Sequence, residues 1–490
     1  MISSTTATAT ANLGGKRALL IGLGLHDGGA GVVRYLVGAR AEVTVTDRRD
    51  ETALAPSLDA LAGLPVTYRL GGHEGIVVAE YDLVVRNPGV PGDAPLLVAA
   101  RTAGVPVEME MTLFLAACPA PVIGVTGTKG KTTATAWIGH VLRGWKPETV
   151  VAGNMGVSAL DQLPQITPRT PVVLELSSFQ LEAMGERGLS PHIAVFTNLS
   201  PDHLDRYPNF EAYADAKWAI ASHQIAGDTL IVPDTIYADT THDAGLAFLA
   251  ARVQGAAAKV VPFGVLPPTV SSYPDGAWWI EEQDTVLWQG AGRSYPVAGP
   301  GQVPLPGAHN RVNAAAVAAA AFAAGVPVDA VRGGLASFRG VPHRYEDLGT
   351  VRGVRYINDT AATAPPAAVA ALRTTTGPVV LLAGGSDKGL DFTEMVAAMQ
   401  TAKAIVLFAG ARPTALAAML HDAGYTGPVV GPVTSMTEAM DAALALAVAG
   451  DTVLLAPGTA SFGVFQNEFD RGEQFRAYVR ARALAPARGE

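Results

Sequence analysis

The chain has 490 residues, of which 49% are hydrophobic and 16% are charged, and its formal net charge is −9. This hydrophobic share excludes a disordered protein, and an acidic chain without a basic stripe is not expected to bind nucleic acid. At about 100–200 residues per domain, the length predicts two to four domains. The single cysteine, Cys118, leaves no internal disulfide, so we expect a cytoplasmic protein.

Residues 1–16 are polar and rich in threonine and alanine, and they lack the charged and apolar regions of a secretory signal. We expect a disordered tail there. No apolar run reaches the ~20 residues that span a membrane, so no membrane contact is predicted. The alanine-rich stretch Asn313–Gly325 is shorter than a span, and we expect it to form a buried helix.

Residues 17–110 begin with the strand-like run RALLIGLGL, pass through a glycine-rich turn and a helical stretch, and reach a second strand, EVTVTD. This alternation predicts a parallel sheet and a Rossmann-like domain. A Gly-x-Gly turn followed by an acid at the next strand end, Asp47, also suits NAD binding, so a NAD-dependent oxidoreductase is an alternative. The third glycine, Gly28, comes one residue late for that motif.

Residues 111–340 predict a central α/β domain of the phosphate-loop ATPase type. Its strand-like runs PVIGVTG, PVVLELSS, IAVFTNLS and DTLIVPD all end in polar residues, and ligands of open α/β sheets bind at such carboxyl ends. The turn-rich stretch 262–306 predicts small β-hairpins. Residues 341–490 contain further strand endings with polar or glycine-rich tails, which predict a third α/β domain, again Rossmann-like.

A strand predicted over Val122–Thr126 runs into the turn GTKGKTT at Gly127–Thr133, and a helix is expected from Lys131 onward. Amides at a helix start, together with the positive end of its dipole, favour a phosphate. A lysine there reaches the terminal phosphates, and the next hydroxyl is placed to bind Mg²⁺. The common phosphate-loop pattern would require a glycine at Val125, so the spacing is unusual. We still predict ATP binding.

Carboxylates that would help to hold the metal follow neighbouring strands. Glu175 ends the run PVVLE, where phosphate-loop enzymes place a metal-binding acid. The stretch TNLSPDHLD places Asp202, His203 and Asp205 in one loop, and Lys217 follows on a predicted helix.

Five motifs in this order resemble the Mur ligase superfamily, ATP-dependent amide ligases that build the cell-wall peptide stem. The resemblance extends from about Arg17 to Val479, and in that family this loop spacing binds ATP, so Val125 is no objection. The motifs are GTKGKTT at Gly127, ELSSFQL at Glu175, TNLSPDHLD at Thr197, GAHNRVN at Gly307 and HR at His343.

The resemblance implies a binding site for ATP and two Mg²⁺ ions, with Lys131, His203 and Lys217 as catalytic residues. Lys217 matches a lysine that becomes carbamylated, which turns a cation into a pair of oxygen ligands. The implied metal ligands are Thr132, Glu175, His203 and Lys217. The implied ATP contacts are Gly127, Thr128, Lys129, Gly130, Lys131, Thr132, Thr133, Asn310, Asn313, Arg344 and Asp359. Lys129 departs from the family, which usually has asparagine there.

The first domain resembles that of the member that adds glutamate to UDP-N-acetylmuramoyl-L-alanine, and folylpolyglutamate synthetase, a related enzyme, lacks such a domain. The resemblance therefore implies that nucleotide, glutamate and ATP as small-molecule substrates, and we expect a monomer. The implied substrate contacts are Asp47, Arg49, Asn87, Asn154, Ser177, Thr363, Lys388 and Ser461. The family often has lysine at Ala361 and aspartate at Gly463. These departures leave L-glutamate as an alternative to the expected D-glutamate.

Overall fold

The structure is a computed structural model that describes residues 13–25, 27–204, 206–237, 243–265, 275–386, 390–410, 413–461 and 463–484. The chain divides into two compact units, Met1–Phe338 and Arg339–Glu490. The predicted tail lies outside the described residues as far as residue 12. Within residues 13–16, Leu13 is buried and Lys16 pairs with Asp82.

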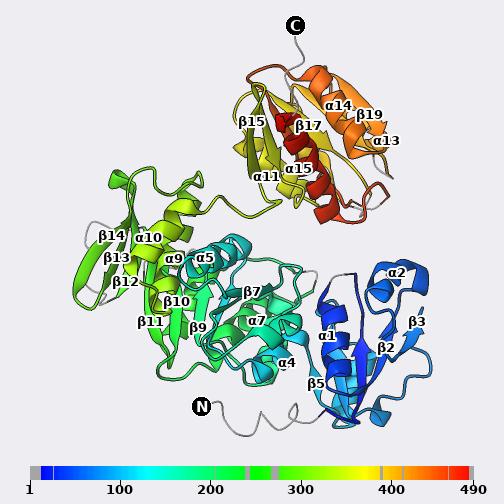
Figure 1. Ribbon diagram of the computed structural model, residues 1–490, viewed down its shortest axis with the longest axis vertical. Coiled ribbons are helices and arrows are strands. Elements are labelled where there is room, and N and C mark those ends of the chain that lie inside the picture. The colour runs from blue at the N-terminus through cyan, green and yellow to red at the C-terminus, as the bar shows by residue number, and fades with distance from the viewer. Residues whose placement is uncertain are drawn as a thin grey trace. The chain divides into compact units, whose positions relative to one another are not determined.

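The first sheet of the larger unit is parallel and has the order β3-β2-β1-β4-β5 (Figure 1). Side chains of β1 alternate between its faces: Leu20 packs in the cluster that contains Val33 of α1, whereas Leu19 packs with Leu97 of α3. Apolar residues on both faces are typical of a parallel sheet covered by helices, which confirms the Rossmann-like prediction. The elements are β1 (Arg17–Ile21), α1 (Asp27–Gly38), β2 (Glu42–Asp47), α2 (Glu51–Asp59), β3 (Val66–Leu70), η1 (Val78–Glu80), β4 (Leu83–Arg86), α3 (Pro95–Thr102) and β5 (Val107–Glu108).

The second sheet of this unit has the order β14-β13-β12-β11-β10-β9-β6-β8-β7. Its strands β12, β13 and β14 pair antiparallel, which confirms the hairpins predicted between residues 262 and 306. The strands are β6 (Val122–Thr126), β7 (Val150–Gly153), β8 (Val172–Glu175), β9 (Ile193–Phe196), β10 (Thr229–Pro233), β11 (Lys259–Val265), β12 (Gly276–Ile280), β13 (Thr285–Gly290) and β14 (Arg293–Ala298). The helices are α4 (Glu110–Ala117), α5 (Lys131–Trp145), η2 (Leu160–Gln165), α6 (Ser178–Glu186), α7 (Phe210–Ser222), η3 (Asp234–Tyr237), α8 (Ala244–Val253), η4 (Glu281–Gln283), α9 (Ala308–Ala323) and α10 (Val328–Ser337).

The alanine-rich helix α9 is buried along half of its length, and it packs against β11, β12 and α5 (Figure 1). Its residues 314–321 are fully buried, which confirms the predicted buried helix, although α9 begins earlier, at Ala308. The neighbouring helices α5 and α10 approach closely at Gly334, where an added Cβ would lie 2.7 Å from the Cα of Val141. Close helix contact here therefore requires glycine.

The smaller unit contains one sheet with the order β15-β16-β20-β17-β18-β19, in which β15 is antiparallel to its neighbour (Figure 1). Residues of α11, α12 and α13 pack on one face, and residues of α14 and α15 pack on the other. This layering confirms the predicted third α/β domain. Among the described residues, no helix is long and apolar enough to cross a bilayer. The elements are β15 (Glu346–Val351), β16 (Val354–Asn358), α11 (Pro365–Thr374), β17 (Val379–Ala383), α12 (Thr393–Met399), β18 (Ala404–Phe408), α13 (Pro413–Asp422), β19 (Val429–Val433), α14 (Met436–Leu446), β20 (Thr452–Leu455) and α15 (Glu468–Leu484).

Candidate active site

The predicted phosphate loop joins the end of β6 to the start of α5, as the sequence indicates. Gly127 has a φ of 141°, and a Cβ there would lie 2.0 Å from Oγ1 of Thr197. Gly130, the residue before α5, has a φ of 81°. Both positions therefore require glycine. Val125, in contrast, lies inside β6 and pairs with β8 and β9, so a glycine there is not needed for the turn.

Residues of the loop after β9 bind the main-chain atoms of this turn. The amide of Thr128 donates to the carbonyl of Asn198 at 3.0 Å, and the amide of Lys129 donates to Oδ1 of Asn198 at 2.9 Å. Oγ1 of Thr197 donates to the carbonyl of Lys129 at 2.7 Å. Because these contacts at position 129 use main-chain atoms, a lysine in place of asparagine leaves them intact. Thr197 and Asn198 were not predicted as site residues, although they begin the TNL motif.

Two lysine ammonium groups meet at the start of the loop. Nζ of Lys131 donates to the carbonyls of Gly127 and Thr128 at 3.0 and 2.9 Å, and Nζ of Lys217 donates to the same Gly127 carbonyl at 2.9 Å. Lys217 lies on α7 and is buried. Burial, and secondarily the charge of Lys131, lower the pKa of Lys217 to about 7. A substantial fraction of this amine is thus uncharged at neutral pH, the form that can react with CO₂.

Glu175 presents a buried carboxylate at the end of β8, one strand away from the loop. Its Oε1 accepts a hydrogen bond from Nδ2 of Asn154 at 2.9 Å. Its Oε2 is buried and has no hydrogen-bond partner among the described residues. A buried carboxylate oxygen without a donor is costly unless it meets a cation, and Mg²⁺ favours such an oxygen. This residue therefore fits a metal site.

The described residues contain no group of three or more His, Cys, Asp or Glu side chains that could hold a metal ion. Any metal beside Glu175 would need further oxygen ligands from hydroxyls, phosphates or a carbamate. That requirement agrees with the predicted ligand set, which includes Thr132 at the start of α5 and Lys217.

His203 lies in an aromatic cluster near the loop. Its ring centroid is 5.3 Å from that of Phe179 and 6.0 Å from that of Tyr213, and its side chain is 47% exposed. The hydroxyl of Tyr213 lies 3.1 Å from Oγ1 of Thr128, which links the cluster to the phosphate loop. Tyr213 was not predicted, although its position one helical turn before Lys217 places both on one face of α7. Asp205 of the same motif lies outside the described residues.

The start of α9 also reaches the loop. Nδ2 of Asn313 donates to Oδ1 of Asn310 at 3.3 Å, and Nδ2 of Asn310 donates to the carbonyl of Pro306 at 2.7 Å. A Cβ on Gly130 would lie 3.4 Å from Oδ1 of Asn313. The structure thus brings residues about 180 positions apart in the sequence to one edge of the sheet, which is where a nucleotide would bind.

The predicted nucleotide-sugar residues surround the glycine turn after β1. Asp47 is buried, and its Oδ2 accepts from the amides of Leu23 and Gly24 at 2.9 and 3.3 Å. Its Oδ1 accepts from the amide of Arg49 at 2.9 Å. Asp47 therefore shapes the turn, whereas Arg49 has an exposed side chain. The side chain of Asn87 lies close to the turn, 3.1 Å from a Cβ position on Gly22.

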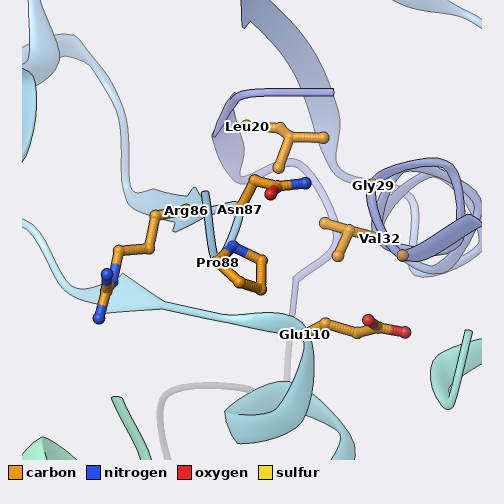
Figure 2. Close-up of a pocket in the computed structure, with 8 residues that line it drawn as sticks. Leu20, Gly29, Val32, Arg86, Asn87, Pro88 and Glu110 are labelled. Atoms are coloured by element: carbon orange, nitrogen blue, oxygen red, sulfur yellow. The ribbon is translucent and has the colours of Figure 1, made fainter. Parts of the chain in front are cut away.

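A pocket opens between the start of α1 and residues 86–88 at the end of β4. It is lined by Leu20, Gly28, Gly29, Val32, Arg86, Asn87, Pro88 and Glu110 (Figure 2). Glu110 is buried, and it accepts hydrogen bonds from Oγ of Ser158 at 2.7 Å and the amide of Ala159 at 2.9 Å. Burial raises the pKa of Glu110 to about 7. A carboxyl group that is about half protonated at pH 7 would repel an anionic ligand less than a fully ionised one.

Two further predicted substrate residues have structural contacts. Asn154 donates to Glu175, so it orients that carboxylate. Ser177 caps α6, because its Oγ accepts from the amide of Gln180 and the side chain of Gln180 accepts from the amide of Ser177. Whether either side chain also contacts a substrate stays a prediction.

In the smaller unit, Arg344 and Asp359 lie close enough for the charge of Arg344 to act on the carboxyl group. Asp359 is buried, its Oδ1 accepts from the amide of Tyr345 at 3.0 Å, and burial raises its pKa to about 6. His343 and Tyr345, on either side of Arg344, have positive φ angles of 66° and 44°. Such angles cost free energy for non-glycine residues and persist only where the surroundings fix them.

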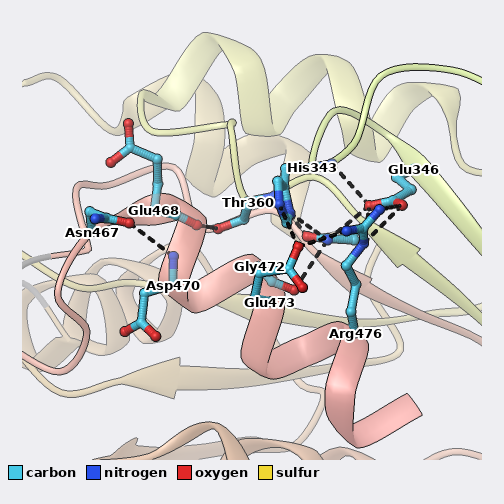
Figure 3. Close-up of polar contacts among 10 residues, drawn as sticks. His343, Glu346, Thr360, Asn467, Glu468, Asp470, Gly472, Glu473 and Arg476 are labelled. Atoms are coloured by element: carbon cyan, nitrogen blue, oxygen red, sulfur yellow. Dashed lines mark hydrogen bonds and ion pairs between the residues drawn. The ribbon is translucent and has the colours of Figure 1, made fainter. Parts of the chain in front are cut away.

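Polar contacts with α15 fix this segment (Figure 3). The ring of His343 lies 3.1 Å from Oε1 of Glu473, and burial lowers the pKa of His343. Glu346 accepts from the amide of His343 at 2.9 Å and from Nε of Arg476 at 3.0 Å. The C-terminal helix therefore anchors the residues that flank Arg344.

The predicted glutamate-binding residues of this unit are only partly described. Ser461 is buried, and its Oγ has no hydrogen-bond partner among the described residues. Thr363 is partly buried in the turn after β16, and Lys388 lies outside the described residues. Gly463, where the family often has aspartate, has a φ of 100°, which a residue with a side chain rarely adopts. The backbone conformation at position 463 therefore favours glycine over aspartate.

Comparison with known proteins assigns all three parts of the chain to one family. Residues 16–108 match the model described as "Mur ligase MurD-like, N-terminal domain", residues 125–321 match "Mur ligase middle domain", and residues 343–459 match "Mur ligase, glutamate ligase domain". The chain belongs to the Mur ligase family. The resemblance inferred from the five motifs is thus confirmed, and the match of the first domain argues against the oxidoreductase alternative.

Individual relatives cover nearly the whole chain. A UDP-N-acetylmuramoylalanine–D-glutamate ligase from Roseiflexus sp. is 47% identical over 470 residues, which cover 95% of this chain and 99% of the relative. The enzyme with the same name from Symbiobacterium thermophilum is 38% identical, with 95% and 98% covered. The crystal structure of a UDP-N-acetylmuramate–alanine ligase, MurC, from Thermotoga maritima has a TM-score of 0.56 at 20% identity, with 95% and 99% covered. That likeness confirms the three-domain α/β fold.

Proposed function

We propose that this Mur ligase joins D-glutamate to UDP-N-acetylmuramoyl-L-alanine with the hydrolysis of ATP to ADP and phosphate. The observation that carries the proposal is the 47% identity, over 95% of the chain, to a relative named for this reaction. The loop Gly127–Thr133 and the buried carboxylate of Glu175 support the ATP-dependent part. We propose a monomer that acts in the cytoplasm, where the single cysteine suits reducing conditions.

The reaction begins with transfer of the γ-phosphoryl group to an oxygen of the L-alanyl carboxylate, which gives an acyl phosphate and ADP. Lys131 contacts the γ-phosphate and offsets charge that develops on it. The turn at Gly127 and Gly130 lets the backbone approach the phosphates closely. Asn310 and Asn313, and Arg344 and Asp359 of the smaller unit, bind the nucleoside end of ATP in this proposal.

Mg²⁺ would be held by Thr132, Glu175, His203 and a carbamylated Lys217, and when bound it would neutralise phosphate charge as a Lewis acid. Mur ligases use ATP and Mg²⁺; the presence of two ions and of the carbamate is part of our proposal. The lowered pKa of Lys217 supports the carbamate, because an uncharged amine attacks CO₂ and then loses a proton to give a carbamate, whose single negative charge is shared by two oxygens.

The second step joins the amino acid. The amine of glutamate attacks the carbonyl carbon of the acyl phosphate, the tetrahedral intermediate loses phosphate, and the nitrogen loses its proton as the amide forms. Ser461, Thr363 and Lys388 are the proposed contacts of the incoming glutamate. The unpartnered buried Oγ of Ser461 supports this role, since a substrate carboxylate could accept its hydrogen bond.

The experiment is phosphate release by the purified chain with Mg²⁺, ATP and UDP-N-acetylmuramoyl-L-alanine, with amino acids offered one at a time. The proposal predicts release with D-glutamate and formation of the dipeptidyl nucleotide. Release with L-glutamate alone would support the alternative acceptor and contradict the stereochemical part. No release with any amino acid would contradict the proposed ligase activity as a whole.

A further inference from the structure

The loop Asn87–Val90 follows β4, and its first two residues, Asn87 and Pro88, line the pocket in Figure 2 opposite the start of α1. It is a tight turn: the amide of Gly89 donates to Oδ1 of Asn87 at 3.0 Å, and the amide of Val90 donates to the carbonyl of Asn87 at 2.9 Å. Its own hydrogen bonds fix its shape. Its position relative to the second sheet must come from other contacts.

Arg206 supplies a contact of that kind from the other side. It lies three residues after His203, and its amide donates to the carbonyl of His203 at 2.9 Å. Its guanidinium group donates to the carbonyls of Pro88, Gly89 and Val90 at 3.3, 3.4 and 3.2 Å. A planar group with donors along its edge can serve several carbonyls of one turn at once, which a lysine cannot match.

The face of the same guanidinium group is also held. Its central carbon lies 4.5 Å from the ring centroid of Phe179, and that ring is the one that contacts His203. Arg206 thus bridges two parts of the proposed site: the aromatic cluster around His203 and the loop that lines the pocket of the first sheet.

A second arginine holds the same turn from within the first sheet. Nη1 of Arg86 donates to the carbonyl of Val90 at 3.1 Å, and Nη2 pairs with Glu182 of α6 at 3.2 Å. Its side chain is 1% exposed. The carbonyl of Val90 therefore accepts hydrogen bonds from two guanidinium groups, that of Arg86 in the first sheet and that of Arg206 after β9 of the second sheet. Both sheets thus contact this turn.

We propose that Arg206 is a positioning residue that fixes the loop Asn87–Val90, and with it the bound nucleotide sugar, relative to the phosphate loop. The inference rests on the proposed function, since it concerns the position of UDP-N-acetylmuramoyl-L-alanine relative to ATP. Phosphoryl transfer requires the carboxylate to lie within about 3–3.5 Å of the phosphorus and in line with it. A loop released from Arg206 would leave that alignment less well defined.

The test compares Arg206→Ala, Arg206→Lys and a control, Arg34→Ala, in steady-state assays with each substrate varied. Arg34 also joins the two sheet regions, through an ion pair with Asp161, but no hydrogen bond or ion pair described for it reaches the loop. We expect Arg206→Ala to lower kcat/KM for the nucleotide sugar by about 30-fold and to leave KM for ATP within about twofold. Arg206→Lys should recover part of the loss, and Arg34→Ala should lose less than about threefold.

Hydrogen exchange of peptides spanning residues 87–90 gives a readout that does not depend on turnover. Exchange should be faster in Arg206→Ala and unchanged in Arg34→Ala. The inference is wrong if Arg206→Ala keeps wild-type kcat/KM and exchange, or if both alanine variants lose activity and thermal stability equally. A wild-type chain without ligase activity would contradict the proposed function instead, while the exchange data would still decide whether Arg206 holds the loop.

Discussion

Replacing Lys217 by methionine should stabilise the larger unit while abolishing ligase activity. The ordinary pKa of a lysine is 10.5, and burial together with Lys131 lowers that of Lys217 to about 7. Between these pH values the unfolded chain binds a proton that the folded chain does not, so stability falls as the pH is lowered from 10.5 to about 7. At 1.36 kcal/mol for each pH unit, this cost reaches about 5 kcal/mol at neutral pH.

Methionine has a similar length and no charge, but it loses the hydrogen bond to the carbonyl of Gly127, worth about 1 kcal/mol. We therefore expect a net gain of about 2–4 kcal/mol at pH 7, shrinking toward zero near pH 10. The chain contains six tryptophans, and all of them precede residue 289. Their fluorescence during thermal unfolding thus reports on the unit Met1–Phe338 alone.

The unfolding comparison should be made in CO₂-free buffer, with bicarbonate added as an internal control. If Lys217 forms a carbamate, bicarbonate and Mg²⁺ should raise the Tm of the wild type and leave Lys217→Met unchanged. ¹³C-bicarbonate should give a carbamate NMR signal in the wild type only. A methionine variant that is less stable than the wild type by the same amount at pH 7 and pH 10 would refute the reasoning.

Lys131→Ala should lower kcat by at least ~10²-fold with a normal circular dichroism spectrum, because Lys131 is the loop cation proposed to contact the γ-phosphate; near-normal turnover would contradict its role. Glu110→Gln should remove a pH dependence of the free energy of unfolding. Because the pKa of Glu110 is raised, the wild type should lose up to about 3 kcal/mol of stability as the pH rises from 4.5 to about 7. Unfolding measured at both pH values should show this loss in the wild type and not in the variant. Gly127→Ala should abolish ATP binding by calorimetry, because its Cβ would lie 2.0 Å from Thr197 Oγ1. Its control, Gly63→Ala, also has a positive φ, of 82°, but open space around the Cβ, and it should bind ATP normally; equal binding in both would count against the steric argument.

The order of strands and helices could be predicted because each has a local signal. The strand Val122–Thr126 and the helix start at Lys131 coincide with β6 and α5, since an apolar run followed by glycines and then by a polar helix start leaves few alternatives. The buried α9 and the hairpins near residue 280 followed from alanine content and turn residues in the same way.

Contacts between distant segments could not be predicted from the sequence. Nothing near Asn198 indicates that its side chain holds the backbone of Lys129, and nothing near Arg206 indicates a partner more than a hundred residues earlier. Nothing near Asp47 indicates that its carboxylate accepts from the backbone amides of Leu23, Gly24 and Arg49. Its contact with the nucleotide stays a prediction. Tyr213 was within reach of sequence reasoning, because its spacing from Lys217 is one helical turn.

The most direct test of the proposed chemistry follows one oxygen atom. UDP-N-acetylmuramoyl-L-alanine labelled with ¹⁸O in both carboxylate oxygens is incubated with the enzyme, ATP, Mg²⁺ and D-glutamate, and the released phosphate is analysed by mass spectrometry. An acyl phosphate predicts one ¹⁸O in each released phosphate, because the bridging oxygen leaves with phosphorus. Phosphate free of ¹⁸O during amide formation would show that the carboxylate is never phosphorylated, and would contradict the account.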